Sequence, residues 1–96
     1  MIEARQTEEF RDWLDGLRDR MARKRIGQRI ARLQIGLFGD SKPVGDKVFE
    51  LRIDHGPGYR VYFAREGNRI VILLCGGDKS TQRRDIERAK EMAANL

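Results

Sequence analysis

Two arginines, Arg52 and Arg60, combine a residue type and a spacing that suit the binding of an anion. Each lies in a segment where apolar and polar residues alternate, Phe49–Ile53 and Tyr59–Phe63, and this pattern predicts strands with one apolar face. If the two strands form an antiparallel hairpin with both apolar faces on the same side, Arg52 lies directly opposite Arg60. Facing like charges destabilise a sheet unless an anion or a carboxylate compensates them, so the hairpin is expected to hold something negative.

The same polar face carries further candidate residues. Glu50 and Tyr62 lie on it, and a later apolar strand leads into Asp78 and Lys79 at one edge of the sheet. Guanidinium groups offer paired donors that match phosphate oxygens, and a lysine adds a compact positive charge. The combination therefore suits a phosphodiester.

A purely structural interpretation of these residues stays open. Arg52 could pair with Glu50 or Asp54, and Arg60 could stack on Tyr62, as surface interactions that contribute little to stability. The spacing favours the functional interpretation only slightly.

Three other features are weaker candidates for a catalytic or binding role. His55 sits in the turn between the two arms, where a polar loop residue is a commoner role than acid-base catalysis. Cys75 is alone in an apolar strand, which suppresses the reactive thiolate. Gly76-Gly77 before a capped helix could cradle a phosphate, but the spacing matches no nucleotide-binding loop. No residue spacing suggests a metal site, and no cofactor is expected.

The first half of the chain is expected to form a strand followed by a helical hairpin. Ile2–Gln6 can form the strand, and Thr7 fits the N-cap of the first helix. Apolar residues then recur at helical spacing in two stripes: Phe10, Trp13, Leu14 and Leu17, then Ala22, Ile26, Ile30, Leu33 and Leu37. The second helix also carries many arginines, which could bind nucleic acid but more often form a solvated surface.

The second half is expected to form the rest of a sheet and a last helix. Gly39–Asp46 has the composition of a loop, and Ile70–Cys75 is apolar throughout, which predicts a central strand covered on both faces. The hairpin arms are expected over Lys47–Ile53 and Tyr59–Arg65, and Ser80 or Asp78 as the cap of the C-terminal helix. The order β-α-α-β-β-β-α predicts one α+β domain over residues 1–96, with helices on one side of a mostly antiparallel sheet.

The composition points to a polyanionic partner. The 96 residues include 20 basic and 15 acidic ones, which gives a net charge of +5. No apolar run approaches the roughly 20 residues that span a bilayer, and the N-terminus lacks the pattern of a signal peptide. We therefore expect a cytoplasmic protein without membrane contact.

Four segments resemble the RelE/ParE superfamily of bacterial toxins, most closely its HigB-like, phage-associated "addiction module killer protein" branch. They are Phe49–Asp54, Gly56–Tyr62, Leu74–Ser80 and Gln82–Ile86, and the resemblance extends over nearly the whole chain. It implies a RelE-like α+β fold and a metal-independent endonuclease that cuts mRNA in the ribosomal A site. In such enzymes the 2′-hydroxyl attacks the adjacent phosphate, so the protein positions the strand and neutralises developing charge.

The resemblance also implies roles for the candidate residues. Arg60 would be the main phosphate-stabilising residue, Arg52 would flank it from the neighbouring strand, and Lys79 would supply a further basic group. RelE has a tyrosine near the position of Asp85, and other HigB-like toxins use histidine, so the general base is left open. Its candidates are Asp78, Glu50 and Tyr62.

The resemblance implies partners and leaves two alternative functions. The expected partners are mRNA on the ribosome and a cognate helix-turn-helix antitoxin, in a complex that binds operator DNA. One alternative is a ParE-like, non-enzymatic inhibitor of DNA gyrase. The other is a basic nucleic-acid-binding module in which the arginine-rich second helix matters more than the hairpin.

Overall fold

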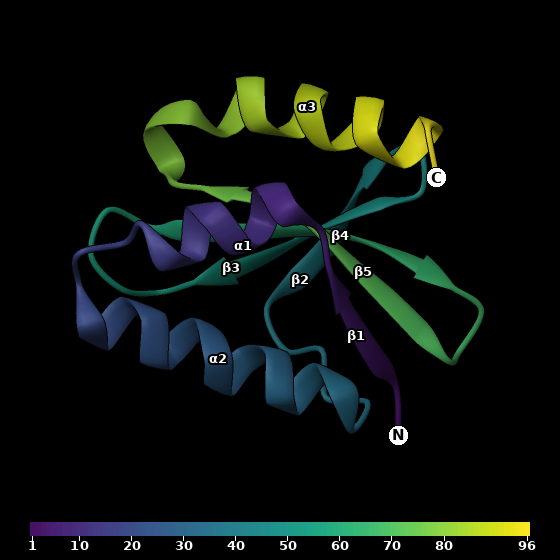
Figure 1. The fold of residues 1–96 in the computed structure, drawn as a ribbon, viewed down its shortest axis with the longest axis horizontal. Coiled ribbons are helices and arrows are strands. Elements are labelled where there is room, and N and C mark those ends of the chain that lie inside the picture. The colour runs from purple at the N-terminus through teal and green to yellow at the C-terminus, as the bar shows by residue number, and fades with distance from the viewer.

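The computed structural model describes residues 1–96 as three α-helices and five strands, with a short 3₁₀ turn (Figure 1). In chain order the elements are β1 (Glu3–Gln6), α1 (Glu8–Asp15), α2 (Arg20–Gln34), β2 (Ser41–Gly45), β3 (Val48–Ile53), β4 (Tyr59–Glu66), β5 (Ile70–Gly77), the 3₁₀ turn η1 (Lys79–Thr81) and α3 (Gln82–Ala94). The fold is α+β and consistent with the RelE-like architecture. No helix combines the length and the apolar character needed to cross a membrane.

The strands form one sheet in the order β1-β5-β4-β3-β2. Only β1 and β5 are parallel, and the other neighbours are antiparallel. The β3–β4 register places Arg52 opposite Arg60, as the alternation of apolar residues predicts. The prediction for Ile70–Cys75 is also confirmed, because β5 lies inside the sheet and its middle residues are buried.

The expected loop Gly39–Asp46 contains a strand, so that prediction is wrong. Strand β2 pairs with β3 at the edge of the sheet, and the order becomes β-α-α-β-β-β-β-α. An edge strand tolerates Pro43, because the side without a neighbour needs no donor. The tight turn to β3 has positive φ at Gly45, Asp46 and Lys47. These turn-forming residues gave the segment the composition of a loop.

The helices cover both faces of the sheet and not one, which corrects a second expectation. Helices α1 and α2 lie on one face and α3 on the other (Figure 1). The core under α1 and α2 is made of apolar residues: Phe10, Ile26, Ile30, Leu33, Leu51, Ile53, Val61, Phe63, Val71 and Leu73. A second core, which includes Val48, Tyr62, Leu74 and Ala89, lies under α3. Strands that are apolar at every position require cover on both sides.

Side-chain caps define where the helices begin. The Thr7 hydroxyl accepts a hydrogen bond from the Phe10 backbone N–H at 3.0 Å, which confirms it as the N-cap of α1. Asp19 caps α2 in the same way. Asp78 accepts from the Ser80 N–H at 2.8 Å and so caps the turn η1, while α3 itself begins one turn later.

Candidate functional site

A shallow pocket of about 300 Å³ lies beside the β3–β4 turn and contains both facing arginines. Its lining residues are Asp40, Arg52, Ile53, Asp54, Gly58 and Arg60. We call this hollow the arginine pocket. The structure thus brings together two of the predicted site residues, from the end of β3 and the start of β4.

Arg52 is the exposed member of the pair. Its Nε and Nη2 atoms lie 3.2 and 3.0 Å from Oδ1 of Asp40, which precedes β2. The compensating carboxylate therefore comes from Asp40, and not from Glu50 or Asp54. The side chains of this ion pair are about half exposed, so the pair itself contributes little to stability.

Arg60 is nearly buried, with 9% of its surface exposed. Its Nη1 atom donates a hydrogen bond to the Gly58 carbonyl, and its Nε lies 3.8 Å from Oε2 of Glu50 without forming a hydrogen bond. Gly58 has a φ of 79°, and a side chain there would press on the Arg60 guanidinium. Gly58 is therefore needed both for the conformation of the turn and for the position of the Arg60 guanidinium.

Glu50 and Tyr62 lie beneath α3 and not on an open polar face, since both are fully buried. Oε2 of Glu50 accepts hydrogen bonds from Gln82 Nε2 at 2.8 Å and from the Tyr62 hydroxyl at 3.2 Å. Oε1 has no partner. Burial, together with the Glu50 carboxylate, raises the pKa of Tyr62 well above its usual value.

Lys79 and Asp78 follow β5 and lie near the Gly58 turn and Arg60. A Cβ at Gly58 would lie 3.5 Å from Cβ of Lys79, so the lysine stem borders the same turn as Arg60. Hydrogen bonds from Ser80 hold the pKa of Asp78 below its usual range, and the nearby Arg60 charge lowers it further. Asp78 is partly exposed and is a carboxylate at neutral pH.

Gly76-Gly77 serves close packing on both sides of β5. A side chain at Gly76 would overlap the Trp13 ring, and one at Gly77 would overlap the Asp85 carboxylate. The Asp85 carboxylate in turn accepts a hydrogen bond from the Thr81 hydroxyl. These contacts explain the two glycines without a bound phosphate.

His55 and Cys75 take the structural roles that the sequence favours. His55 Nε2 lies 2.8 Å from Oδ2 of Asp19, and its ring stacks near Tyr59, so it ties the β3–β4 turn to the start of α2. Cys75 is buried, and desolvation raises the pKa of its thiol to about 12. No group of three or more His, Cys, Asp or Glu residues lies close enough to hold a metal ion.

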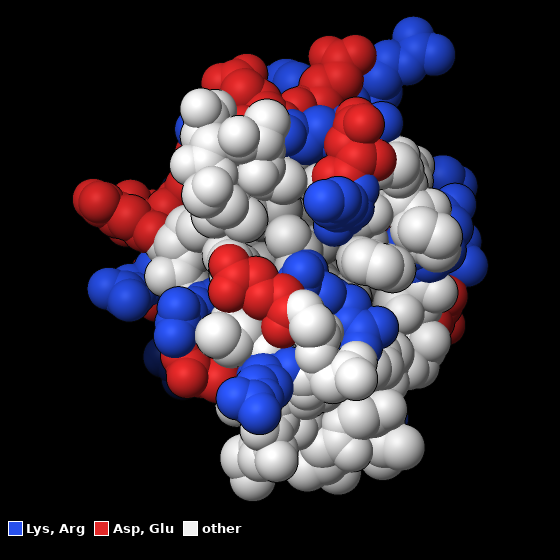
Figure 2. Space-filling view, turned by 90° about the vertical axis from the view of Figure 1, so that its right-hand side faces the viewer, with Lys and Arg blue, Asp and Glu red and all other residues white.

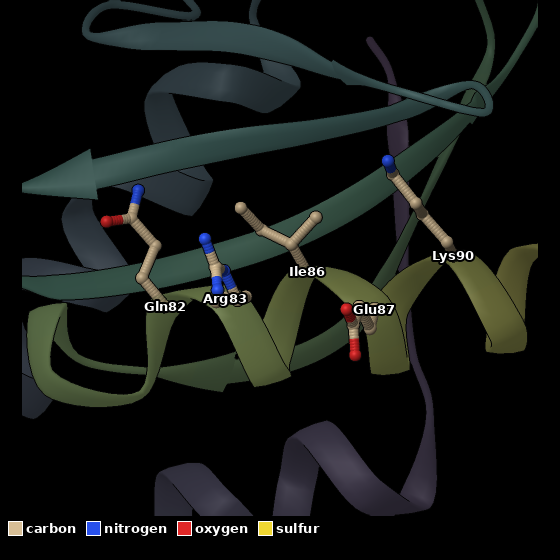
Figure 3. A pocket seen from close by; sticks show the side chains of 5 residues that line it. All are labelled: Gln82, Arg83, Ile86, Glu87 and Lys90. Atoms are coloured by element: carbon tan, nitrogen blue, oxygen red, sulfur yellow. The ribbon is translucent and has the colours of Figure 1, made fainter.

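A second pocket runs along α3, on the face of the sheet that also buries Glu50 and Arg60 (Figure 3). Gln82, Arg83, Ile86, Glu87 and Lys90 line it, and Lys90 approaches Asp46 at 3.8 Å. It contains none of the predicted site residues.

Sequence reasoning missed Asp40 and Gln82, which hold Arg52 and Glu50. Asp40 belongs to a segment expected to be a loop, and its partner is twelve residues away. Gln82 reaches Glu50 only because α3 folds over the sheet. Only the position of β2 and α3 in three dimensions reveals either contact.

A family model described as "Phage derived protein Gp49-like (DUF891)" matches residues 12–94, which include all the residues of the arginine pocket. The chain belongs to this Gp49-like family. The family is of the RelE/HigB-like toxin type, so the expected resemblance holds at that level. The Gp49-like chain is also similar to an uncharacterised protein of Haemophilus influenzae, at 53% identity over 95 residues, which cover 99% of this chain and 96% of that relative.

Proposed function

We propose that this Gp49-like protein is the toxin of a type II toxin-antitoxin module and cleaves mRNA on the ribosome without a metal ion. The observation that carries the proposal is the grouping of Arg52, Arg60 and Lys79 around the Gly58 turn. Membership of a toxin-type family supports the same function. A phosphodiester is the substrate group that matches two guanidinium groups and an ammonium.

The proposed reaction is an internal transfer at one phosphate. The ribose 2′-hydroxyl loses its proton to a base and attacks the adjacent phosphorus, while the bond to the 5′-oxygen of the next nucleotide breaks. The departing oxygen takes up a proton, which leaves a 2′,3′-cyclic phosphate and a 5′-hydroxyl. Arg60 neutralises the charge that develops on the phosphoryl oxygens, with Arg52 and Lys79 on either side. A preorganised donor of this kind typically accounts for about 10²- to 10³-fold in rate.

Asp78 is the base that we assign among the three candidates. Glu50 and Tyr62 are fully buried under α3, whereas Asp78 is partly exposed beside Lys79. Its low pKa keeps it ionised at neutral pH, although it also makes it a weak base. We assign Glu50 a different role: its carboxylate, fixed by Gln82 and Tyr62, positions the guanidinium of Arg60.

Expression of wild type and Arg60→Lys in growing cells, with primer extension on abundant transcripts, tests the function. Lysine keeps the charge next to Glu50 but loses the forked donors, so we expect a folded protein with cleavage reduced by about 10²-fold. The matched control is Arg69→Lys, because Arg69 is exposed and lies in the turn that follows β4, at the end of the strand opposite to Arg60. Growth arrest with intact transcripts would contradict the proposal, and inhibition of gyrase in a supercoiling assay would identify the ParE-like alternative.

The same proposal includes an antitoxin partner. A toxin-type family implies a cognate antitoxin, and we infer that it carries a helix-turn-helix domain and that the complex binds operator DNA. Co-expression with the product of the adjacent reading frame should restore growth and yield a complex that shifts the promoter fragment. Growth that is not restored would contradict this part of the proposal.

A further inference from the structure

The net positive charge of the protein comes from one helix, because the rest of the chain carries a slight negative excess. Helix α2 contains six basic residues and no acidic one. The other residues of the chain comprise 14 basic and 15 acidic ones, so they nearly cancel. Figure 2, which views the molecule from the right-hand side of Figure 1, shows basic and acidic side chains interspersed. The excess positive charge is therefore concentrated on α2, and it is not distributed over the surface as charge that serves solubility would be.

The basic residues of α2 lack carboxylate partners. None of the six takes part in an ion pair, although several are exposed. Arg20 and Lys24 are four residues apart, as are Arg25 and Arg29, and like charges at this spacing destabilise a helix. A solvated helix surface normally relieves such pairs with glutamate or aspartate. An external polyanion would relieve them here.

A groove follows this helix toward the arginine pocket. A hollow of about 210 Å³ is lined by Arg25, Gln28, Arg29, Arg32, Ile53 and Asp54. We call it the α2 groove. Ile53 and Asp54 also line the arginine pocket, so the two hollows share a border.

Arg29 fixes the geometry of that border. Its Nη1 donates to the carbonyl oxygen of Arg52 at 2.7 Å, and its Nη2 donates to the carbonyl oxygen of Phe38 at 3.4 Å. These bonds hold α2 against the end of β3. Arg25 and Arg32 make no such bonds and are exposed, so their guanidinium groups are available to a ligand.

We propose that the α2 groove binds the sugar-phosphate backbone of a single RNA strand that continues out of the arginine pocket. The inference rests on the proposed function, since it extends the site at which that strand would be cut. The shared border favours one continuous strand over an acidic protein segment, because the strand already has a phosphate in the adjoining pocket. Exposed arginines suit phosphate oxygens better than they suit any apolar partner.

Fluorescence anisotropy with labelled single-stranded RNA tests the groove in purified protein. The probes are a trinucleotide and a dodecanucleotide, measured with wild type, with Arg25→Gln/Arg32→Gln and with the matched control Arg65→Gln/Arg69→Gln. The control removes the same charge at the far end of β4. Thermal unfolding of each variant checks that the exposed substitutions leave the fold intact.

We expect wild type and the control to bind the long probe more tightly than the short one. The groove variant should lose about tenfold in affinity for the long probe at low salt. The slope of log affinity against log salt concentration should also become shallower, by roughly 0.7 for each lost phosphate contact. Its affinity for the trinucleotide should be unchanged. Equal affinities of groove variant and control for the long probe would overturn the proposal, as would a preference of the groove for double-stranded RNA or for polyglutamate.

The two proposals fail in different ways. If the protein cuts no RNA but the groove variant no longer binds the long probe more tightly than the short one, the proposed RNA-binding groove is supported and the proposed endonuclease function is rejected. If wild type cuts mRNA but the groove variant binds both probes like the control, only the groove fails. Arg60→Lys should weaken binding of the trinucleotide, while the dodecanucleotide should still bind more tightly than the trinucleotide.

Discussion

The two faces of the sheet differ in what they bury. The face under α1 and α2 covers a core made only of apolar side chains. The face under α3 also buries Glu50 and Arg60, two charged residues from neighbouring strands. Burial of apolar surface stabilises a fold, whereas burial of charge costs free energy unless every polar atom is paired. The first face therefore supports the fold, and the second holds in place a residue for which we propose a function.

The charged pair under α3 is not satisfied in full. Oε1 of Glu50 and Nε of Arg60 have no hydrogen-bond partner, and each such buried atom typically costs about 1–3 kcal/mol. Stability alone does not favour this arrangement. Arg60 nevertheless lines the arginine pocket, with Nη1 bonded to the Gly58 carbonyl and Nε near Glu50, and this position suits the phosphate binding that we propose.

The largest effect is expected from Phe63→Ala on the apolar face. Phe63 is fully buried and packs between the rings of Phe38 and Phe49, with ring centroids 6.2 and 5.4 Å away. Urea unfolding should show a loss of about 3–5 kcal/mol. Cleavage per folded molecule should be unchanged, because the side chain does not reach the arginine pocket. Loss of activity at full stability would reverse the assignment of the two faces.

The charged pair should behave as a coupled unit. Arg60→Met leaves the Glu50 carboxylate buried without a cation, which is expected to cost about 3 kcal/mol or more. The double variant Glu50→Gln/Arg60→Met should recover most of that stability and remain inactive. Urea unfolding and primer extension measure the two quantities. Simple additivity of the single substitutions would show that the residues are not coupled.

The paired glycines of β5 provide an internal comparison between the faces. Gly76→Ala should cost about 1–3 kcal/mol, because its methyl group would overlap the rigid Trp13 ring. Gly77→Ala should cost less, because the overlapping atoms are at the end of the Asp85 side chain, which can rotate away from Thr81. Thermal unfolding of both variants decides the order. A larger loss for Gly77→Ala would mean that the Asp85 carboxylate is held rigidly.

The smallest expected effect is a loss of stability in alkali that originates under α3. The raised pKa of Tyr62 means that the folded protein keeps a proton that the unfolded chain releases above its usual pKa of 10.0. Its contribution is therefore fully present below pH 10 and declines as the pH rises further. Tyr62→Phe should make this decline shallower in urea unfolding between neutral and alkaline pH. Tyr59→Phe, the matched control, keeps Tyr62 and should keep the decline.

The hairpin could be predicted from the sequence because its side chains alternate with period two. That period fixes which residues share a face, so it also fixes the facing positions of Arg52 and Arg60. Strand β2 could not be predicted, since Pro43 and Gly45 give a short edge strand the composition of a loop. The missed strand also hid the partner of Arg52, because Asp40 lies just before it.

The burial of Glu50 and Tyr62 could not be predicted from the same alternation. Polar residues on one side of a strand usually indicate solvent, and nothing local reveals that α3 covers them. One signal was present in the sequence: Ile70–Cys75 is apolar throughout, and a strand of this kind needs cover on both faces. Applied to the whole sheet, that signal would have placed a helix over the polar face of the hairpin.

The most direct test of the central claim is the rate at which purified protein cuts mRNA bound in the A site of isolated ribosomes. We expect wild type to cleave the mRNA and to leave a cyclic phosphate at the new 3′ end. We also expect a rate about 10²-fold lower for Arg60→Lys at an unchanged midpoint of unfolding. Equal rates for the two proteins, or no cleavage by folded wild type, would contradict the role of the arginine pocket in catalysis.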